Sequence, residues 1–482
     1  MPTPRIIPST YEASKVKTGI VHLGLGAFHR AHQAVYVEKH LARTGGGEIG
    51  IAAANLRSNK AITESLAKAD FSYHVAEYAS RADVTVREIR AIRQALFPGG
   101  DAAELLALMA SPDVRIVTLT VTEKGYYISA DGTLLADDPA IRADLARPDN
   151  PATPIGILVR ALELRKQAGV APFAVLSCDN LPENGVRTKR AVVALAALRD
   201  KDLAAWIDAK TRFPSTMVDR IVPAMTESSF KDVEALLGRP DPNAVVAEEF
   251  TQWVVEEFPG RPDWEPDGVQ MTADVRPYEG MKLRLLNGSH SLLAYAGGMA
   301  GKETIVACMR EPLLAALVER YLQTEGGPSL HDVPEQDWKA SAAAIVKRFS
   351  NDSLAHKTNQ IAMDGSQKIS QRWMSGARDR LMAGAACPCT ALGLAAWVYH
   401  MREKDEAGGA FPMRDPLRER MLETLRPLDN APGAVIDALF AQADLIPAEV
   451  AANAAYRERV KAMYALMLDK GALAAVKATL ES

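Results

Sequence analysis

The stretch that decides the fold is Gly19-Ile-Val-His-Leu-Gly24-Leu-Gly26, together with the segment that continues from Ala27 to about Ala42. The first part is a short apolar run that ends in paired glycines, and the second has helical periodicity. A strand, a Gly-x-Gly turn and a helix form the unit that holds a dinucleotide pyrophosphate at the helix N-terminus. The usual third glycine is replaced by His29. Tight turns also use glycine without any ligand, so this pattern needs support from the rest of the chain.

The next predicted strand, residues 49–56, bears on the choice of cofactor. Its tip is the place where an acidic residue usually binds the adenosine ribose of NAD. Here the tip reads Asn55-Leu-Arg57-Ser58-Asn59-Lys60 and has no acid. The dinucleotide-binding pattern predicts NAD as cofactor, and because Arg57 and Lys60 are suited to a 2′-phosphate, NADP is not excluded.

Two further buried strands are predicted at residues 114–121 and 173–177, and both end in polar clusters. The first cluster begins with Thr122 and Glu123, and the second contains Asn180. In an open parallel sheet the ligand crevice lies outside the carboxyl ends of the strands, so both clusters should open onto it. Asn184-Gly185 is better explained as a pair of turn formers.

The texture of the chain changes near Tyr278, after which long Ala- and Leu-rich helical periods dominate. The sequence therefore predicts an α/β Rossmann-like N-terminal domain, residues 1–280, and a predominantly α-helical C-terminal domain, residues 281–482. Asp219-Arg220 lies in a semi-buried extended segment and is expected to form a buried ion pair or a structural support.

The second domain begins with Lys282-Leu-Arg-Leu-Leu-Asn287-Gly-Ser-His290. At about 100° per residue, Glu279, Lys282, Asn287 and His290 share one side of a helix. The interleaved leucines predict burial. A buried neutral lysine is a possible base, and Asn and His are possible donors to a substrate oxygen. A hydrogen-bonded core network is the commoner explanation of such a pattern.

Composition narrows the class of protein. The chain has 482 residues and a formal net charge of −4, which gives no reason to expect nucleic acid or a membrane surface as partner. It has no long apolar run and no signal-peptide pattern, so a cytoplasmic location is expected. The four cysteines are expected to be reduced core thiols. No cluster has metal-ligand spacing, so chemistry without a metal is expected.

A polar stretch between Arg348 and Arg372 also stands out. Surface loops commonly have this composition. Within it, however, Lys368 and Arg372 would lie one turn apart on a helix, a suitable pair for an anionic group on a small substrate.

With these residues established, the chain resembles the long-chain polyol dehydrogenases, the mannitol dehydrogenase family of metal-independent, NAD(P)-dependent enzymes. The resemblance covers nearly the whole length. It is carried by five motifs, which are Gly24-Leu-Gly26-Ala-Phe-His29-Arg-Ala-His32-Gln, Thr120-Val-Thr-Glu123-Lys-Gly, Ser177-Cys-Asp-Asn180, Met217-Val-Asp219-Arg and Lys282-x4-Asn287-x2-His290.

The resemblance implies an active site between the two domains and a role for each matching residue. Lys282 would be the general acid/base, Asn180 and Asn287 the donors to the substrate oxyanion, and His290 a partner of a substrate oxygen. Glu279 looks like the family's glutamate that gates proton exit. The cofactor would contact the following residues: Gly24, Gly26, Phe28, His29, Asn55, Arg57, Thr122 and Glu123. The family's frequent monomers imply a monomer or weak oligomer.

Within the family, residues 360–368 and Asn287-Gly-Ser-His290 look most like fructuronate reductase (mannonate oxidoreductase). Such an enzyme must bind a carboxylate, which would suit Lys368 and Arg372. Ser370 departs from the proline usual at that place in the family. Two alternatives stay open: an enzyme for a neutral polyol such as mannitol, arabinitol or sorbitol, and a dinucleotide sensor that kept the fold without the chemistry.

Overall fold

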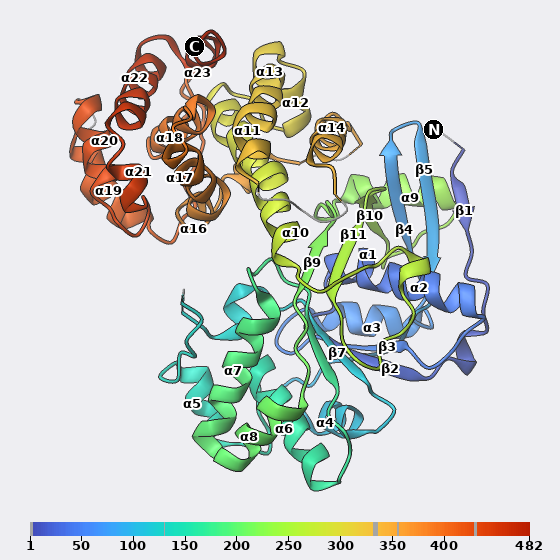
Figure 1. The fold of residues 1–482 in the computed structure, drawn as a ribbon. Helices are drawn as coiled ribbons and strands as arrows, with labels where there is room; N and C mark the ends of the chain where they lie inside the picture. Colours follow the sequence, from blue (N-terminus) through green and yellow to red (C-terminus); the bar gives the residue numbers. More distant parts are fainter. Residues whose placement is uncertain (1–2, 130, 331–335, 354–355, 429–430) are drawn as a thin grey trace. The chain divides into compact units, whose positions relative to one another are not determined.

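The computed structural model describes residues 3–129, 131–330, 336–353, 356–428 and 431–482. The chain forms two compact units, Met1–Arg276 and Pro277–Ser482, drawn in blue to green and in yellow to red respectively (Figure 1). The first is an α/β unit and the second is helical. The predicted fold class, a Rossmann-like domain followed by a mainly helical domain, is confirmed.

The centre of the N-terminal unit is a five-stranded sheet with the order β6-β3-β2-β7-β8, and all its neighbouring strands are parallel. Its strands have the following bounds: β2 Thr18–Leu23, β3 Gly50–Ala54, β6 Ile92–Leu96, β7 Ile116–Leu119 and β8 Ala174–Ser177. The order places β2, which leads into the glycine turn, in the middle. The predicted strands at the starts of the two polar clusters, β7 and β8, lie side by side.

Helices cover both faces of this sheet, as Figure 1 shows. Successive strand residues point to opposite faces, so Ile20 and Ile116 pack with α1, α2 and α3, whereas Val21 and Val117 pack with α4, α6, α7 and α8. Burial on both sides explains why these strands read as continuous apolar runs. The unit's helices are α1 Ala27–Ala31, α2 Gln33–Thr44, α3 Lys60–Lys68, α4 Ala103–Ala110, α5 Pro139–Ala146, α6 Pro154–Gln167, α7 Asn184–Arg199, α8 Lys201–Lys210 and α9 Glu227–Leu237.

Two smaller sheets complete the unit, with the orders β1-β5-β4-β10 and β12-β11-β9. Their strands are β1 Arg5–Ile7, β4 Tyr73–Ser80, β5 Asp83–Ile89, β9 Thr216–Asp219, β10 Val245–Glu248, β11 Gln252–Glu256 and β12 Gln270–Thr272. At the end of β9, the guanidinium of Arg220 is fully buried and pairs with Glu77 at 2.9 Å. It also donates to the carbonyl of Glu248 at 2.9 Å. Arg220 therefore joins segments distant in sequence, as a structural support.

The helix predicted from Ala27 to about Ala42 is two helices. His32 lies between α1 and α2 with φ −124° and ψ −89°. Its Nε2 donates to the carbonyl of Gln252 on β11, 2.8 Å away. A tertiary hydrogen bond therefore accompanies a break that helical periodicity cannot reveal.

The described part of the C-terminal unit contains helices and no strand. They are α10 Arg276–Met281, α11 Gly288–Met299, α12 Ile305–Met309, α13 Pro312–Tyr321, α14 Trp338–Phe349, α15 Thr358–Ile361, α16 Gly365–Ile369, α17 Ser375–Met382, α18 Pro388–His400, α19 Arg418–Leu425, α20 Pro432–Phe440, α21 Ala448–Ala451, α22 Ala454–Lys470 and α23 Ala472–Leu480. Helices α11 and α18 are buried along their whole lengths and form the middle of the core. Nowhere in the described ranges is a helix long and apolar enough to cross a membrane.

Three segments of this unit are π-helical: η4 Lys282–Asn287, η5 Leu322–Gly326 and η7 Ser370–Met374. At the end of η4, the Gly288 N–H donates to the carbonyl of Leu283, five residues back. The uniform α-helical spacing expected across Lys282 to His290 is therefore wrong. In a π-turn, residues five apart align, which brings Lys282 and Asn287 to the same side. Segments η4 and η7 pack against one another.

Candidate functional site

The glycine turn after β2 is too tight for any larger residue. Gly24 has φ +114°, a conformation that side chains disfavour. A Cβ atom at this position would lie 2.1 Å from the carbonyl oxygen of Thr120. Gly26 then caps α1 with extended backbone. The cradle for a dinucleotide predicted at Gly24 and Gly26 thus fits the backbone that the structure shows.

A stacked pair of histidines supports this turn. The rings of His22 and His29 are 3.4 Å apart and nearly parallel, at 9°. Nε2 of His22 lies 2.9 Å from the carbonyl of Gly24, to which it can donate. Burial lowers the pKa of His22 to about 3 and holds that of His29 well below its usual value, so both are neutral near pH 7. An aromatic contact replaces the helix–strand packing that a third glycine would give.

The other predicted cofactor residues of this half are placed as follows. Phe28 stacks on His32 at 5.0 Å. Asn55, at the end of β3, is buried and donates to the carbonyl of Asn59 at 3.3 Å. Arg57 is exposed, and its guanidinium lies over the ring of Tyr127 at 5.8 Å. A cation at the tip of β3 is thus held beside an aromatic ring, where the predicted ribose contact falls.

Thr122 and Asn180 follow the ends of the neighbouring strands β7 and β8. A carboxylate that received no predicted role links the two ends: Asp179 accepts from the backbone N–H of Val121 at 2.9 Å and of Thr122 at 3.0 Å. Asn180, the next residue, is exposed. An acidic residue in a polar cluster after a strand was the available signal for Asp179. Glu123 begins a short 3₁₀ turn, Glu123–Tyr126.

Asn184, explained above as a turn former, is a buried structural residue at the start of α7. Its Nδ2 donates to the carbonyls of Ser177 at 3.1 Å and Thr216 at 2.9 Å. Its Oδ1 accepts from the N–H of Thr216 at 2.9 Å. It therefore joins β8 to β9, and Asn180 is the asparagine of this loop that remains exposed.

In the C-terminal unit, π-helix η4 carries the predicted catalytic group. Lys282 and Asn287 begin and end it, and Glu279 lies one turn earlier, on α10. All three are partly exposed, so the burial predicted for Lys282 and Asn287 is wrong: only Leu285 and Leu286 of this segment are buried. Two side chains hold the backbone between and after these residues. The Tyr321 hydroxyl donates to the carbonyl of Arg284 at 2.6 Å, and the Trp373 indole donates to that of Gly288 at 3.0 Å.

His290 lies on α11 and is buried. Its ring stacks on Phe349 at 4.2 Å and meets His356 edge-on at 5.0 Å. Burial holds the pKa of His290 well below its usual value, and the nearby His356 and Arg372 act in the same direction. Among the described residues, its Nε2 has no hydrogen-bond partner. A neutral imidazole with an unused nitrogen is suited to a substrate hydroxyl.

Arg372 and Lys368, predicted to bind a substrate anion, lie on η7 and α16. Nη1 of Arg372 donates to Ser291 Oγ at 2.8 Å and to the carbonyl of Asn287 at 3.3 Å. Burial lowers its pKa to about 10, so it stays charged near pH 7. The ammonium of Lys368 donates to the carbonyls of Ile361 and Met363. Arg372 therefore also holds the backbone of Asn287 in place.

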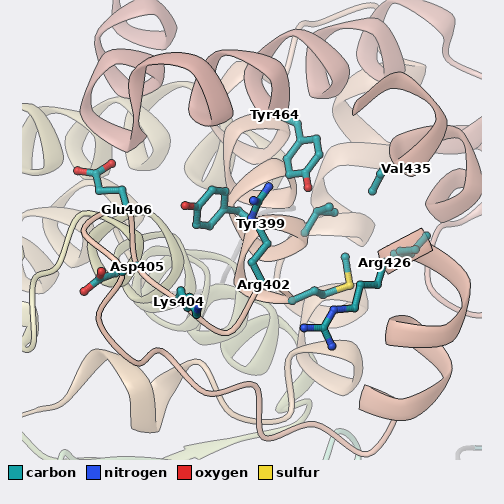
Figure 2. A pocket seen from close by; sticks show the side chains of 12 residues that line it. Tyr399, Arg402, Lys404, Asp405, Glu406, Arg426, Val435 and Tyr464 are labelled. Atoms are coloured by element: carbon teal, nitrogen blue, oxygen red, sulfur yellow. The ribbon is translucent and has the colours of Figure 1, made fainter. Parts of the chain in front are cut away.

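A hollow of about 350 Å³ also lies in the C-terminal unit (Figure 2). It has an aromatic and charged lining that includes Tyr399, Arg402, Lys404, Asp405, Glu406, Arg426, Val435 and Tyr464. The predicted site residues are not among those that line it, so it adds nothing to the assignment.

The remaining expectations concern thiols and metals. All four cysteines are buried and free. Within the described ranges, no group of three or more His, Cys, Asp or Glu residues is placed to hold a metal ion.

Comparison with known proteins identifies the family of this chain. Residues 18–266 match the model of the mannitol dehydrogenase Rossmann domain, and residues 274–468 match that of the mannitol dehydrogenase C-terminal domain. The chain is 40% identical to the D-mannonate oxidoreductase of Escherichia coli (strain K12), over 97% of each chain. It is 38% identical to the mannitol 2-dehydrogenase of Cereibacter sphaeroides, over 94% of this chain and 97% of that protein.

A solved structure gives the same result. The Pseudomonas fluorescens mannitol 2-dehydrogenase, in a ternary complex with NAD and D-mannitol, superposes with a TM-score of 0.88 at 35% identity. The match covers 99% of this chain and 97% of that one. Two family models over nearly the whole chain, and relatives of this similarity, show that the protein belongs to the mannitol dehydrogenase family.

Proposed function

We propose that the protein is an NAD(P)-dependent oxidoreductase that interconverts a secondary alcohol and a ketone of an open-chain sugar acid, as a fructuronate reductase (D-mannonate oxidoreductase) does. The observation that carries the proposal is the match along 97% of the chain to a D-mannonate oxidoreductase, with Lys282, Asn287 and His290 in one helical segment. The absence of an acid at Asn55 to Lys60 leaves room for either cofactor.

The proposed chemistry gives each predicted residue a role. NAD(P), when bound, accepts or supplies the hydride. In the oxidation direction, Lys282 takes the hydroxyl proton in its neutral form, and Glu279 passes the proton outwards. Asn287 and Asn180 donate to the developing alkoxide, which stabilises it by about 3–4 kcal/mol for each well-placed donor. Neutral His290 orients a neighbouring hydroxyl.

Hydrogen bonds to the backbone of η4 and α11 would hold Asn287 in its orientation. Arg372, Trp373 and Tyr321 contact backbone carbonyls of η4 and the first turn of α11. These hydrogen bonds hold the backbone of the segment that carries Lys282 and Asn287. Such preorganisation is what oxyanion stabilisation requires.

Cofactor choice is tested by Arg57→Ala. We expect a higher Michaelis constant for NADPH and an unchanged one for NADH, because in this proposal the Arg57 guanidinium at the tip of β3 binds the 2′-phosphate. Initial rates with both cofactors, compared with Arg81→Ala on another exposed loop as control, measure this. Equal effects on both cofactors, or none on either, would remove Arg57 from cofactor recognition.

Substrate class is tested by Lys368→Ala. We expect the Michaelis constant for a sugar acid to rise about tenfold more than that for the matching neutral polyol, because a charge-assisted bond to the carboxylate is lost. The control is Lys347→Ala, an exposed lysine on α14. An equal loss on both substrates would mean that Lys368 does not bind the carboxylate.

A second candidate, a neutral polyol dehydrogenase, is favoured by the likeness to the mannitol 2-dehydrogenases. The deciding experiment compares initial rates of reduction of fructuronate, tagaturonate and fructose, each with NADH and NADPH. A preference for fructuronate supports the proposal, and a preference for fructose replaces it with the second candidate. Absence of turnover with any of these would favour the dinucleotide-sensor alternative. A monomeric or weakly oligomeric state and a cytoplasmic location remain predictions.

A further inference from the structure

Thr122 has a backbone conformation that threonine rarely adopts. Its φ is 64° and its ψ is 164°, a combination that is close to glycine's exclusive region. A β-branched residue pays a steric cost there, so other contacts must hold it in place. Thr122 directly precedes Glu123, in the segment to which the family resemblance assigns cofactor contact.

Asp179 supplies those contacts. Oδ1 of Asp179 accepts from the N–H of Thr122 at 3.0 Å. Oδ2 accepts from the N–H of Val121 at 2.9 Å and from the hydroxyl of Tyr126 at 2.8 Å. Two consecutive backbone N–H groups on one carboxylate fix the course of the chain between them. The end of β7 is thus clamped to the end of β8.

The clamp is closed by a buried hydroxyl network. The hydroxyl of Tyr126, which is fully buried, also lies 2.5 Å from Oγ of Ser177, the last residue of β8. Since Tyr126 donates its proton to Asp179, Ser177 donates to Tyr126. Each member then has a partner, which makes the arrangement rigid.

We propose that Asp179 is a positioning residue: by holding Thr122 in its strained conformation, it places both the Thr122–Glu123 segment and Asn180 for cofactor and substrate. The inference rests on the proposed function for its catalytic consequence. The clamp itself can be tested without that function. Asp179 need not touch the substrate, because it acts through its neighbours on both strand ends.

The charge state of Asp179 adds a pH dependence. Burial raises its pKa to about 6, and nearby Glu123 acts in the same direction, while the hydrogen bonds from Tyr126, Val121 and Thr122 oppose them. Burial and the charge of this carboxylate raise the pKa of the neighbouring Cys178 thiol. As the pH falls through about 6, the carboxyl gains a proton and loses acceptor capacity towards Thr122. Its pKa in the unfolded chain is lower, so this protonation does not itself favour unfolding.

The first test is Asp179→Asn. An amide offers one acceptor oxygen in place of two, so one of the two backbone N–H groups loses its partner. We expect turnover to fall about 10- to 100-fold, as for a small displacement of reacting groups, with a weaker affinity for NADH. For the wild-type protein we expect kcat/KM to fall as the pH drops below about 6, and this fall should be absent in Asp179→Asn. The matched control is Asp200→Asn, which accepts from the N–H groups of Asp202 and Leu203 at the start of α8; it should leave turnover and the pH profile unchanged.

The second test is a rescue by Thr122→Gly. Glycine adopts this backbone conformation readily, so Thr122→Gly in the Asp179→Asn background should recover part of the lost turnover. A structural role unconnected with Thr122 predicts no recovery. Wild-type turnover and an unchanged pH profile in Asp179→Asn would overturn the proposal.

Amide hydrogen exchange separates this inference from the proposed function. The Val121 and Thr122 amides should exchange slowly in the wild-type protein and faster in Asp179→Asn, but not in Asp200→Asn. Equal protection in all three would overturn the clamp whatever the enzyme's activity. A clamp seen by exchange, in a protein that turns over none of the tested sugars, would instead count against the proposed function alone.

Discussion

Replacing Lys282 by alanine should lower kcat by a factor of about 10² or more, because a general acid/base would be lost. The substitution should leave the fold intact. Lys282 is partly exposed, and the hydrogen bonds from Tyr321 and Arg372 to backbone carbonyls of η4, and from Arg284 to Asp379, do not involve its side chain. Single-turnover measurements with saturating cofactor and substrate would isolate the chemical step.

Two controls belong to this experiment. Lys347→Ala removes an exposed lysine of the same unit and should leave turnover unchanged. A small primary amine in the buffer should restore part of the activity of Lys282→Ala, because it can carry the proton in place of the side chain. Turnover near the wild-type value in Lys282→Ala would contradict the assigned role.

Gly24→Ala should be the most damaging substitution in the N-terminal unit. Two effects add: the left-handed backbone at φ +114°, and a Cβ atom placed 2.1 Å from the Thr120 carbonyl. The backbone effect alone costs about 1–3 kcal/mol, and the clash forces the strand-to-helix turn to move. We expect a lower free energy of unfolding in denaturant titrations and weak binding of NADH by fluorescence.

Gly45→Ala separates these two effects. Gly45 also has positive φ, +75°, at the end of α2, but a Cβ there would meet nothing within 4 Å. Its substitution should cost only about 1 kcal/mol and leave NADH binding unchanged. If Gly24→Ala and Gly45→Ala behaved alike, close packing of the turn against Thr120 would not matter.

The sequence predicts four strands of the central sheet, β2, β3, β7 and β8, because they are buried on both faces; β6 received no prediction. Burial makes β2, β7 and β8 read as continuous apolar runs, and the glycines mark the turn that follows β2. The mixed sheet of β4 and β10 received no prediction. These strands pair across about 170 residues, from Val75 to Val245, and no local pattern records such a partner.

Within the site, residue types were visible but the supporting contacts were not. The sequence shows that polar residues follow β8. Only the structure distinguishes buried Asn184 from exposed Asn180 and shows that Asp179 accepts from two backbone N–H groups. The spacing of Lys368 and Arg372 predicted that Arg372 binds an anionic group of the substrate. Its bond to the Asn287 carbonyl depends on the packing of η7 on η4, which no spacing rule encodes.

The π-helical turn of η4 has a consequence for how this chain can be altered. It accommodates one residue more than an α-turn, so everything after Asn287 is shifted in phase by one position relative to Lys282. Deleting a single residue between them, a change that alignments treat as minor, would restore α-helical geometry and turn the face of α11 by about 100°. Leu292 and Leu293 would then leave the core, or Lys282 would leave its place. The position of Lys282 and the packing of α11 therefore both depend on the length of η4. Surface loops tolerate changes of length far better than these six residues.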